Sequence, residues 1–167
     1  IIDIGGESTR RYDNRPGSLP VGADEELRRV VPVIERLSQI LDVPISVDTY
    51  KAVVARRCLE SGANMVNNVW GVSADPDMLV LVAEQDVPVV LMHNQTDHQY
   101  RDLIRDMIER LGKAVSKALE LGVRRENIIV DPGIGFGKVA SQSLEIERRL
   151  GEFKALGLPI LVGPSRK

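Results

Sequence analysis

One apolar segment that runs into an aspartate and a glycine-rich loop constrains this chain more than any other feature. Residues 128–131 read Ile-Ile-Val-Asp, and residues 132–138 read Pro-Gly-Ile-Gly-Phe-Gly-Lys. The β-branched run predicts a strand, Pro132 favours extended geometry at Asp131, and the glycines allow a tight turn close to a ligand. The segment therefore places a carboxylate at the carboxyl end of a strand, beside a loop that a flat molecule can approach.

The same design recurs along the chain. Amphipathic helical patterns alternate with apolar segments that predict strands, and these segments cover residues 1–4, 44–47, 65–66, 87–92, 128–131 and 158–162. Each segment runs into polar residues, which in chain order are Glu7 and Ser8, Asp48, Asn67, His93, Asp131 and Lys167. Alternation of this kind predicts parallel strands, either in a doubly wound open sheet or in a closed barrel. A barrel brings all strand ends to one mouth, whereas an open sheet gathers polar groups at one switch point, so the pattern favours a barrel.

We therefore predict an α/β fold of the (β/α)8 TIM-barrel type, with about six strand-helix units in a single domain over residues 1–167. A whole barrel of this type needs about 250 residues. We expect the chain to be an incomplete barrel that lacks the first and the last strand. Asp24, Thr49 and Asp75 precede helical patterns and are predicted to cap them.

Composition narrows the class of protein. Hydrophobic residues make up 43% of the chain and charged residues 28%, which is typical of a globular core. The net charge of −2 gives no basic field, so we expect neither nucleic acid nor a membrane as a partner. We also expect no membrane span and no signal peptide. The single cysteine, Cys58, can form no internal disulfide, which suits a cytoplasmic location.

The predicted ring of polar groups suits a flat heterocycle with several hydrogen-bonding edges. Asp131 offers two oxygens that match the parallel N–H donors of an amino-pyrimidinone. Asn67 can donate and accept, Asp48 can accept from a further ring N–H, and Lys167 can donate to a carbonyl. Ordinary structural roles stay open for two of them, since Asp48 can cap a helix and Asn67 can support a loop.

Other polar residues receive simpler interpretations. Arg10 and Arg166 suit a phosphate or a carboxylate. We interpret His93 as a structural histidine because no acid–base partner is identifiable, and Lys138 as a solvated side chain. The glycine loop lacks the G-x-G-x-x-G spacing of dinucleotide sites, and the sequence holds no cluster of metal ligands, so we predict no metal site within this chain.

Taken together, the polar blocks resemble those of dihydropteroate synthase, a family of folate-pathway enzymes. The matching blocks are residues 3–10 (Asp-Ile-Gly-Gly-Glu-Ser-Thr-Arg), 46–49 (Ser-Val-Asp-Thr), 66–68 (Val-Asn-Asn), 91–93 (Leu-Met-His), 131–138 and 163–167 (Gly-Pro-Ser-Arg-Lys). They span essentially the whole chain, in order.

The resemblance implies a transferase that joins p-aminobenzoate to a pterin pyrophosphate and releases dihydropteroate and pyrophosphate. The residues that it implies for pterin binding are Asp48, Asn67, Asp131, Phe136, Gly163 and Lys167. It places Thr9, Arg10 and Arg166 against p-aminobenzoate and pyrophosphate, and it implies catalytic roles for Asp48, Lys167 and Arg10. It also implies Mg²⁺ on the pyrophosphate, sensitivity to sulfonamides and a homodimer.

The chain departs from the family pattern at three places, one of which is Ser143, where an asparagine is frequent. Residues 11–15 interrupt the usual passage from serine-threonine-arginine to proline-glycine, and we expect them to weaken sulfonamide binding relative to p-aminobenzoate. Asn68 stands where an aspartate is common. Two other functions stay open, namely the pterin-binding barrel of a methyltetrahydrofolate:corrinoid methyltransferase and a non-catalytic pterin-binding fragment. We expect the isolated fragment to be poorly active, because it would lack part of the anion site.

Overall fold

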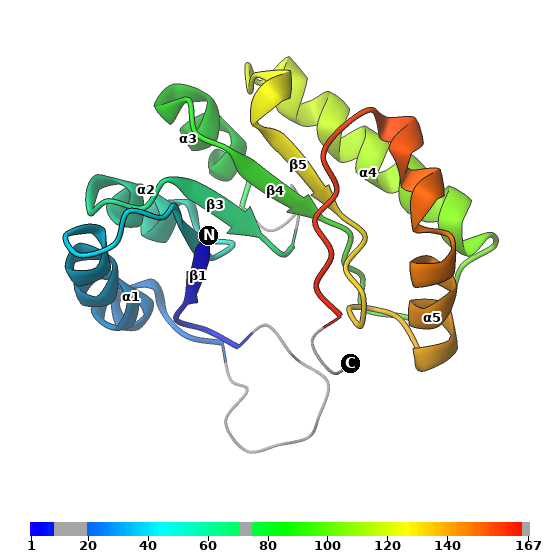
Figure 1. Cartoon of the computed structure of the whole chain (residues 1–167), viewed down its shortest axis with the longest axis horizontal. Helices are drawn as coiled ribbons and strands as arrows, with labels where there is room; N and C mark the ends of the chain where they lie inside the picture. The colour runs from blue at the N-terminus through cyan, green and yellow to red at the C-terminus, as the bar shows by residue number, and fades with distance from the viewer. Residues whose placement is uncertain (9–19, 71–74, 165–167) are drawn as a thin grey trace.

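The computed structural model describes residues 1–8, 20–70 and 75–164, and it contains a parallel sheet with helices along its outer side (Figure 1). The strands are β1 (Ile2–Gly5), β2 (Ile45–Asp48), β3 (Met65–Asn68), β4 (Val89–Met92) and β5 (Ile128–Asp131). Their order in the sheet is the order of the chain, and each neighbouring pair is parallel. A doubly wound sheet reverses its order at a switch point, whereas this sheet does not. The predicted α/β fold of an incomplete barrel is therefore confirmed.

Helices connect successive strands and lie on one side of the sheet. They are α1 (Ala23–Ser38), α2 (Ala52–Glu60), α3 (Asp77–Gln85), α4 (Leu103–Glu120) and α5 (Ala140–Arg148), with the shorter 3-10 helices η2 (Arg125–Asn127) and η3 (Leu150–Leu156). Crossovers between parallel strands are right-handed in nearly all proteins, and they place each helix against the strands it joins. Within the described ranges, no helix combines the length and the apolar character needed to cross a membrane.

The two faces of the sheet differ in character because side chains alternate along each strand. The helix-facing residues belong to the main hydrophobic core and are Ile45, Val47, Val66, Val89, Leu91, Ile128 and Val130. The residues between them point to the other face and include Ser46, Asp48, Asn67, Met92 and Asp131. Polar residues at the carboxyl ends of the strands thus lie on the face turned away from the helices.

The sixth predicted strand is present only as one bridge. Ile160 pairs with Val130 in a parallel bridge, in which the Val130 N–H donates to the Pro159 carbonyl at 3.0 Å and the Leu161 N–H donates to the Val130 carbonyl at 2.9 Å. Pro159 has no N–H to extend the ladder, and Pro164 lacks one too. The segment follows β5 in Figure 1, but the prediction of six full strands is wrong by this one.

Helix starts were predicted with mixed success. The prediction for Asp24 is wrong, since α1 begins at Ala23 and Asp24 lies inside its first turn. The helix after Asp75 begins one residue later than predicted, since α3 starts at Asp77 with Pro76 as its N-cap residue, but Asp75 does bind the start of this helix. The Asp75 carboxylate accepts from the Asp77 N–H at 3.0 Å and also from the Ala52 N–H at 2.7 Å, so one side chain joins the starts of α3 and α2.

Candidate functional site

Three of the predicted site residues lie on one face of the sheet, at its carboxyl edge. Asp48 of β2 is paired with Asn67 of β3, and parallel neighbours of this kind stand about 4.8 Å apart. Asn67 pairs with Val90 of β4, and Asp131 of β5 pairs with Met92, which is two residues further along β4. The two-residue step keeps Asp131 on the same face as Asn67. The structure therefore brings these residues to the same face and the same edge of the sheet, as a barrel mouth requires.

Asp3 adds a carboxylate that was not predicted as a site residue. Its Oδ2 accepts a hydrogen bond from the Asn67 amide nitrogen at 3.0 Å. The contact fixes the orientation of the Asn67 amide, with its oxygen directed away from Asp3. The signal was present in the sequence, because Asp3 is an inward position on β1, two residues before the Gly5 that pairs with Asp48.

The Asp131 carboxylate is held by the loop that follows it. Asp131 is 6% exposed, and its Oδ1 accepts from the Gly133 N–H at 2.7 Å. Gly133 has a φ of +67°, and a Cβ there would lie 2.2 Å from the His93 carbonyl oxygen. The predicted tight turn is confirmed, and glycine is required at this position for conformation and for space. Phe136 is half-buried, and its N–H donates to the Gly133 carbonyl at 3.0 Å.

Lys138 and His93 form a buried pair beside this loop. Lys138 is 6% exposed and His93 is 4% exposed, so the prediction of a solvated Lys138 is wrong. The Lys138 ammonium lies 3.1 Å from His93 Nδ1. Burial first, and then the charges of Lys138 and Arg110, lower the pKa of His93 to about 3. His93 is therefore neutral at physiological pH, which fits a structural histidine but gives it a partner that the sequence did not reveal.

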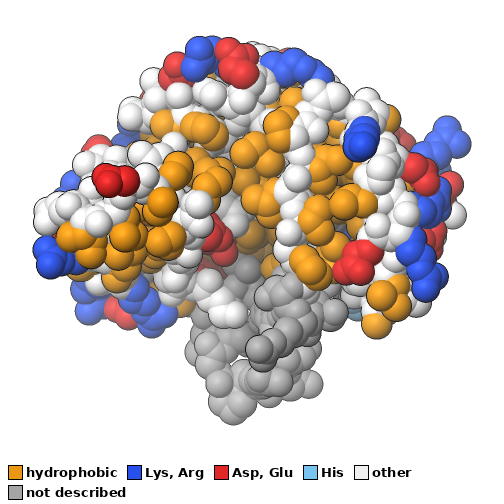
Figure 2. All heavy atoms as spheres, in the orientation of Figure 1, with side chains coloured by type: hydrophobic (Ala, Val, Ile, Leu, Met, Phe, Trp, Pro, Cys, Tyr) orange, Lys and Arg blue, Asp and Glu red, His pale blue; other side chains and the backbone are white. Residues whose placement is uncertain are grey.

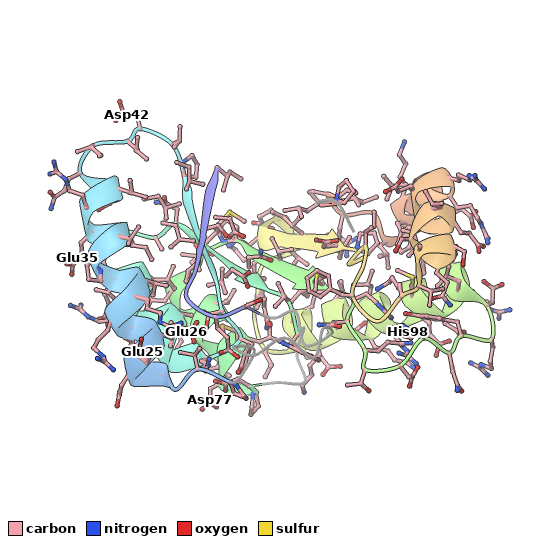
Figure 3. All side chains as sticks on the ribbon, turned by 90° about the horizontal axis from the view of Figure 1, so that it is seen from below. Glu25, Glu26, Glu35, Asp42, Asp77 and His98 are labelled. Atoms are coloured by element: carbon pink, nitrogen blue, oxygen red, sulfur yellow. The ribbon has the colours of Figure 1, made fainter. Side chains whose placement is uncertain are left out.

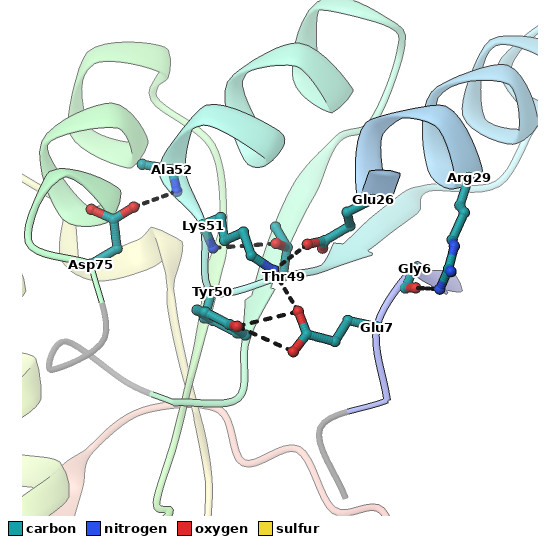
Figure 4. A network of polar contacts seen from close by, with 9 residues as sticks. All are labelled: Gly6, Glu7, Glu26, Arg29, Thr49, Tyr50, Lys51, Ala52 and Asp75. Carbon is teal, nitrogen blue, oxygen red and sulfur yellow. Dashed lines mark hydrogen bonds and ion pairs between the residues drawn. The ribbon is translucent and has the colours of Figure 1, made fainter. Parts of the chain in front are cut away.

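A second buried network joins the end of β1 to the helices (Figure 4). The Lys51 ammonium lies 2.5 Å from a Glu7 oxygen and 2.5 Å from a Glu26 oxygen, and the Tyr50 hydroxyl donates to Glu7 at 3.1 Å. Burial acts to lower the pKa of Lys51, but the hydrogen bonds to Glu26 and Glu7 outweigh it and raise that pKa above its ordinary value. Glu7, Lys51 and Glu26 thus connect the loop after β1, the start of α2 and α1.

The starts of α1 and α3 lie at the same end of the molecule as the carboxyl edge of the sheet. In Figure 3, Glu25 and Glu26 of α1 and Asp77 of α3 lie at one end, and Asp42 lies at the opposite end. The amino ends of helices carry partial positive charge and free N–H groups. The carboxyl edge of the sheet therefore combines acidic side chains with a backbone field that favours anions.

The remaining predicted residues are placed only in part. Gly163 is exposed, and a Cβ at this position would meet nothing within 4 Å. Thr9, Arg10, Arg166 and Lys167 lie outside the described residues. Within the described ranges there is no group of three His, Cys, Asp or Glu side chains that could hold a metal ion. These residues alone do not fit a Mg²⁺ site.

A parallel sheet in chain order, with acids and an amide gathered at its carboxyl edge, defines an α/β barrel of the small-molecule-binding kind. The sequence model of the family described as pterin binding enzyme matches residues 1–167. The chain belongs to the pterin-binding enzyme family.

Named relatives in this family are dihydropteroate synthases. The Bacillus subtilis enzyme is 50% identical over 167 residues, which are 100% of this chain and 57% of the relative. The Clostridium beijerinckii enzyme is 47% identical over 167 residues, which are 100% of this chain and 60% of the relative. The chain thus spans less than two thirds of the length of these relatives.

Solved structures of dihydropteroate synthases share the fold. The Clostridium difficile enzyme, crystallised in the presence of pteroic acid, has a TM-score of 0.92 and 48% identity over 99% of this chain and 62% of that one. The Xanthomonas albilineans enzyme with 4-aminobenzoic acid has a TM-score of 0.91 and 42% identity, with 99% of this chain and 59% of that one covered. The fold and the relatives agree on the family.

Proposed function

We propose that this chain is the central part of a dihydropteroate synthase. The observation that carries the proposal is the placement of Asp48, Asn67 and Asp131 on one face of the sheet at its carboxyl edge, in a chain whose relatives are synthases at 47–50% identity. The reaction would join p-aminobenzoate to 6-hydroxymethyl-7,8-dihydropterin pyrophosphate, giving 7,8-dihydropteroate and pyrophosphate. The relative from Xanthomonas albilineans has been solved in complex with 7,8-dihydropteroate, which supports this assignment.

Recognition of the pterin would rest on Asp131. The carboxylate has about four acceptor positions, and the Gly133 N–H uses one of them. Burial strengthens hydrogen bonds from a ligand because water competes less in a low-dielectric site. Asn67 and Asp48 would hold a second edge of the ring, and the half-buried Phe136 would contact its face.

The chemical step needs positioning more than a strong base. The amine nitrogen attacks the pterin methylene carbon, the bond from that carbon to the pyrophosphate oxygen breaks, and the amine proton leaves for solvent or the departing pyrophosphate. Asp48 would stabilise positive charge at the methylene, while Arg10, Arg166 and Lys167 would offset charge on the substrates. We expect Asp48→Asn to lower turnover, and full turnover with unchanged pterin binding would rule out this role.

Several finer statements belong to the same proposal. Magnesium would arrive with the pyrophosphate, and the roles assigned to side chains do not depend on it. Cytoplasmic location and a homodimer follow from the family resemblance. Residues 11–15, which lie outside the described ranges, would set the ratio of sulfonamide to p-aminobenzoate binding. Deleting them should change this ratio in an inhibition assay.

Asp131→Asn tests the pterin site directly. The substitution keeps the shape of the side chain but replaces one acceptor oxygen with a donor, so we expect pterin affinity to fall by about tenfold to a hundredfold, since hydrogen bonds to charged groups contribute about 1.5–3 kcal/mol. Calorimetry with pteroic acid and a dihydropteroate assay would measure this in the full-length protein. Asp42→Asn is the matched control, because Asp42 is exposed at the opposite end of the molecule (Figure 3).

The same two assays separate the proposed enzyme from the alternatives. A methyltransferase would bind the pterin without releasing pyrophosphate when p-aminobenzoate is added. A non-catalytic binding protein would give heat with pteroic acid and no product. Unchanged pterin affinity in folded Asp131→Asn would refute the proposed site.

A further inference from the structure

Three acceptors surround the buried nitrogen of Lys138. Its Nζ lies 2.6 Å from the Phe136 carbonyl oxygen, 3.2 Å from the His93 carbonyl oxygen and 3.1 Å from His93 Nδ1. Three acceptors match the three protons of an ammonium. A buried ammonium is stable only when acceptors of this kind bind its protons. The burial of Lys138 therefore requires the positions of the Phe136 carbonyl and His93 to be maintained.

The acceptors belong to two segments that flank Asp131. His93 follows β4 directly, and its N–H donates to the Asp131 carbonyl at 2.8 Å. Phe136 lies in the loop after β5, together with Gly133, whose N–H holds the Asp131 carboxylate. Lys138 therefore adds a side-chain link between the end of β4 and the loop that holds the Asp131 carboxylate and carries Phe136.

The loop of residues 132–138 needs such links because its glycines allow many backbone conformations. Gly133, Gly135 and Gly137 have φ values of +67°, +78° and +61°, and glycine reaches this region without favouring it over others. External contacts must therefore select one shape. Lys138 supplies the central contact, and the Tyr100 hydroxyl supplies another by donating to the Gly137 carbonyl at 2.8 Å.

We propose that Lys138 is a positioning residue, which holds the Phe136 carbonyl and His93 together and so fixes the loop that orients Asp131 and Phe136 toward the proposed pterin site. The proposal rests on the function proposed above, in which these two residues bind the pterin. Lys138 touches no substrate in this scheme and acts only through the loop.

The tautomer of His93 shows whether its contact with Lys138 is present. An ammonium donates only, so Nδ1 must accept and the ring proton lies on Nε2. The charged and aromatic groups near the ring are Lys138 and Arg110, with the Tyr100 ring centre at 6.0 Å. With a pKa of about 3, His93 is expected as the neutral Nε2–H tautomer at pH 7. His98 is the other histidine of residues 1–167, and in the full-length protein the His93 ¹⁵N signals are those that a His93→Gln variant loses.

Lys138→Met tests the proposal, because methionine keeps an unbranched chain and removes all three donors. We expect the His93 tautomer to shift, and its pKa to rise while staying below 6.5 because burial remains. Affinity for pteroic acid should fall by about tenfold to a hundredfold, because displacement of Asp131 weakens hydrogen bonds between the ligand and a charged group. In turnover, the KM for the pterin pyrophosphate should rise more than the KM for p-aminobenzoate. Lys113→Met is the matched control, because the Lys113 side chain is 74% exposed.

Each result of these experiments either supports or overturns the proposal. A folded Lys138→Met protein with wild-type affinity for pteroic acid overturns the proposal, and so does an Nδ1–H tautomer of His93 in the wild type, which needs no variant. If Lys138→Met does not fold, Lys138→Gln is the second variant, since it keeps one amide donor group. Wild-type affinity for pteroic acid in Lys138→Gln also overturns the proposal. If the wild type binds no pteroic acid, the proposed function fails, whereas the NMR signals still report on the contact between Lys138 and His93.

Discussion

Replacing Lys51 with methionine would leave two carboxylates without their shared cation. The Glu26 side chain is 1% exposed, the Glu7 side chain 8% and the Lys51 side chain 17%, so little water could take the place of the ammonium. Removing one partner of a buried ion pair costs about 3–5 kcal/mol. The free energy of unfolding of a small domain is about 5–15 kcal/mol, so this single side chain accounts for a large part of the total.

Urea unfolding followed by circular dichroism would measure this loss at pH 7. Lys117→Met is the matched control, since Lys117 pairs with Glu120 at 3.3 Å on the surface and its side chain is 54% exposed. Exposed pairs contribute about 0–1 kcal/mol. Adding Glu26→Gln to Lys51→Met removes one stranded charge, and it should return about 1–3 kcal/mol.

The dependence on pH follows from the raised pKa of Lys51. Because the folded state binds this proton more tightly than the unfolded state, the stabilisation is complete below the ordinary lysine pKa of 10.5 and is lost as the pH climbs through the raised value. The difference between wild type and Lys51→Met should therefore shrink only at strongly alkaline pH. A loss below about 1 kcal/mol at pH 7, or a double variant less stable than Lys51→Met, would refute the reasoning.

Two further predictions concern the backbone around the site. Gly133→Ala should lower the free energy of unfolding by more than about 2 kcal/mol, because the position is left-handed and the new methyl would meet the His93 carbonyl. Gly151→Ala, with open space around it, should leave the urea midpoint nearly unchanged, and equal effects at both glycines would contradict this. Asp75→Ala should cost about 1–2 kcal/mol because two helix starts lose an acceptor, whereas Asp42→Ala should be silent in the same titration.

Periodicity predicted the fold because it reflects local geometry. Each apolar run faces a helix with one half of its residues, so strand identity and the sequential order of β and α elements could be derived from the sequence. The prediction of a strand at residues 158–162 was wrong because this segment pairs with one strand only and has a proline at position 159, so it forms a single bridge. The apolar pattern of a sequence does not show that a backbone N–H is missing.

Contacts between distant segments could not be predicted in the same way. Lys138 meets His93 from 45 positions away, and Lys51 meets Glu7 from 44 positions away. In the sequence both lysines are ordinary charged residues near loops. Their burial is decided by carbonyl and carboxylate groups that converge only once the sheet has formed. Asp3 is different, since strand alternation alone would have placed it beside the other inward residues.

Along β2, β3 and β5, residues that pack against the helices alternate with residues of the proposed site, so substitutions at adjacent positions should affect different properties. Val47, Val66 and Val130 pack against the helices, while the next residue in each strand is one that we propose binds the pterin. A library that varies only the valines would tune thermal tolerance and leave ligand preference in place. One that varies only their neighbours would explore new ligands on an unaltered scaffold.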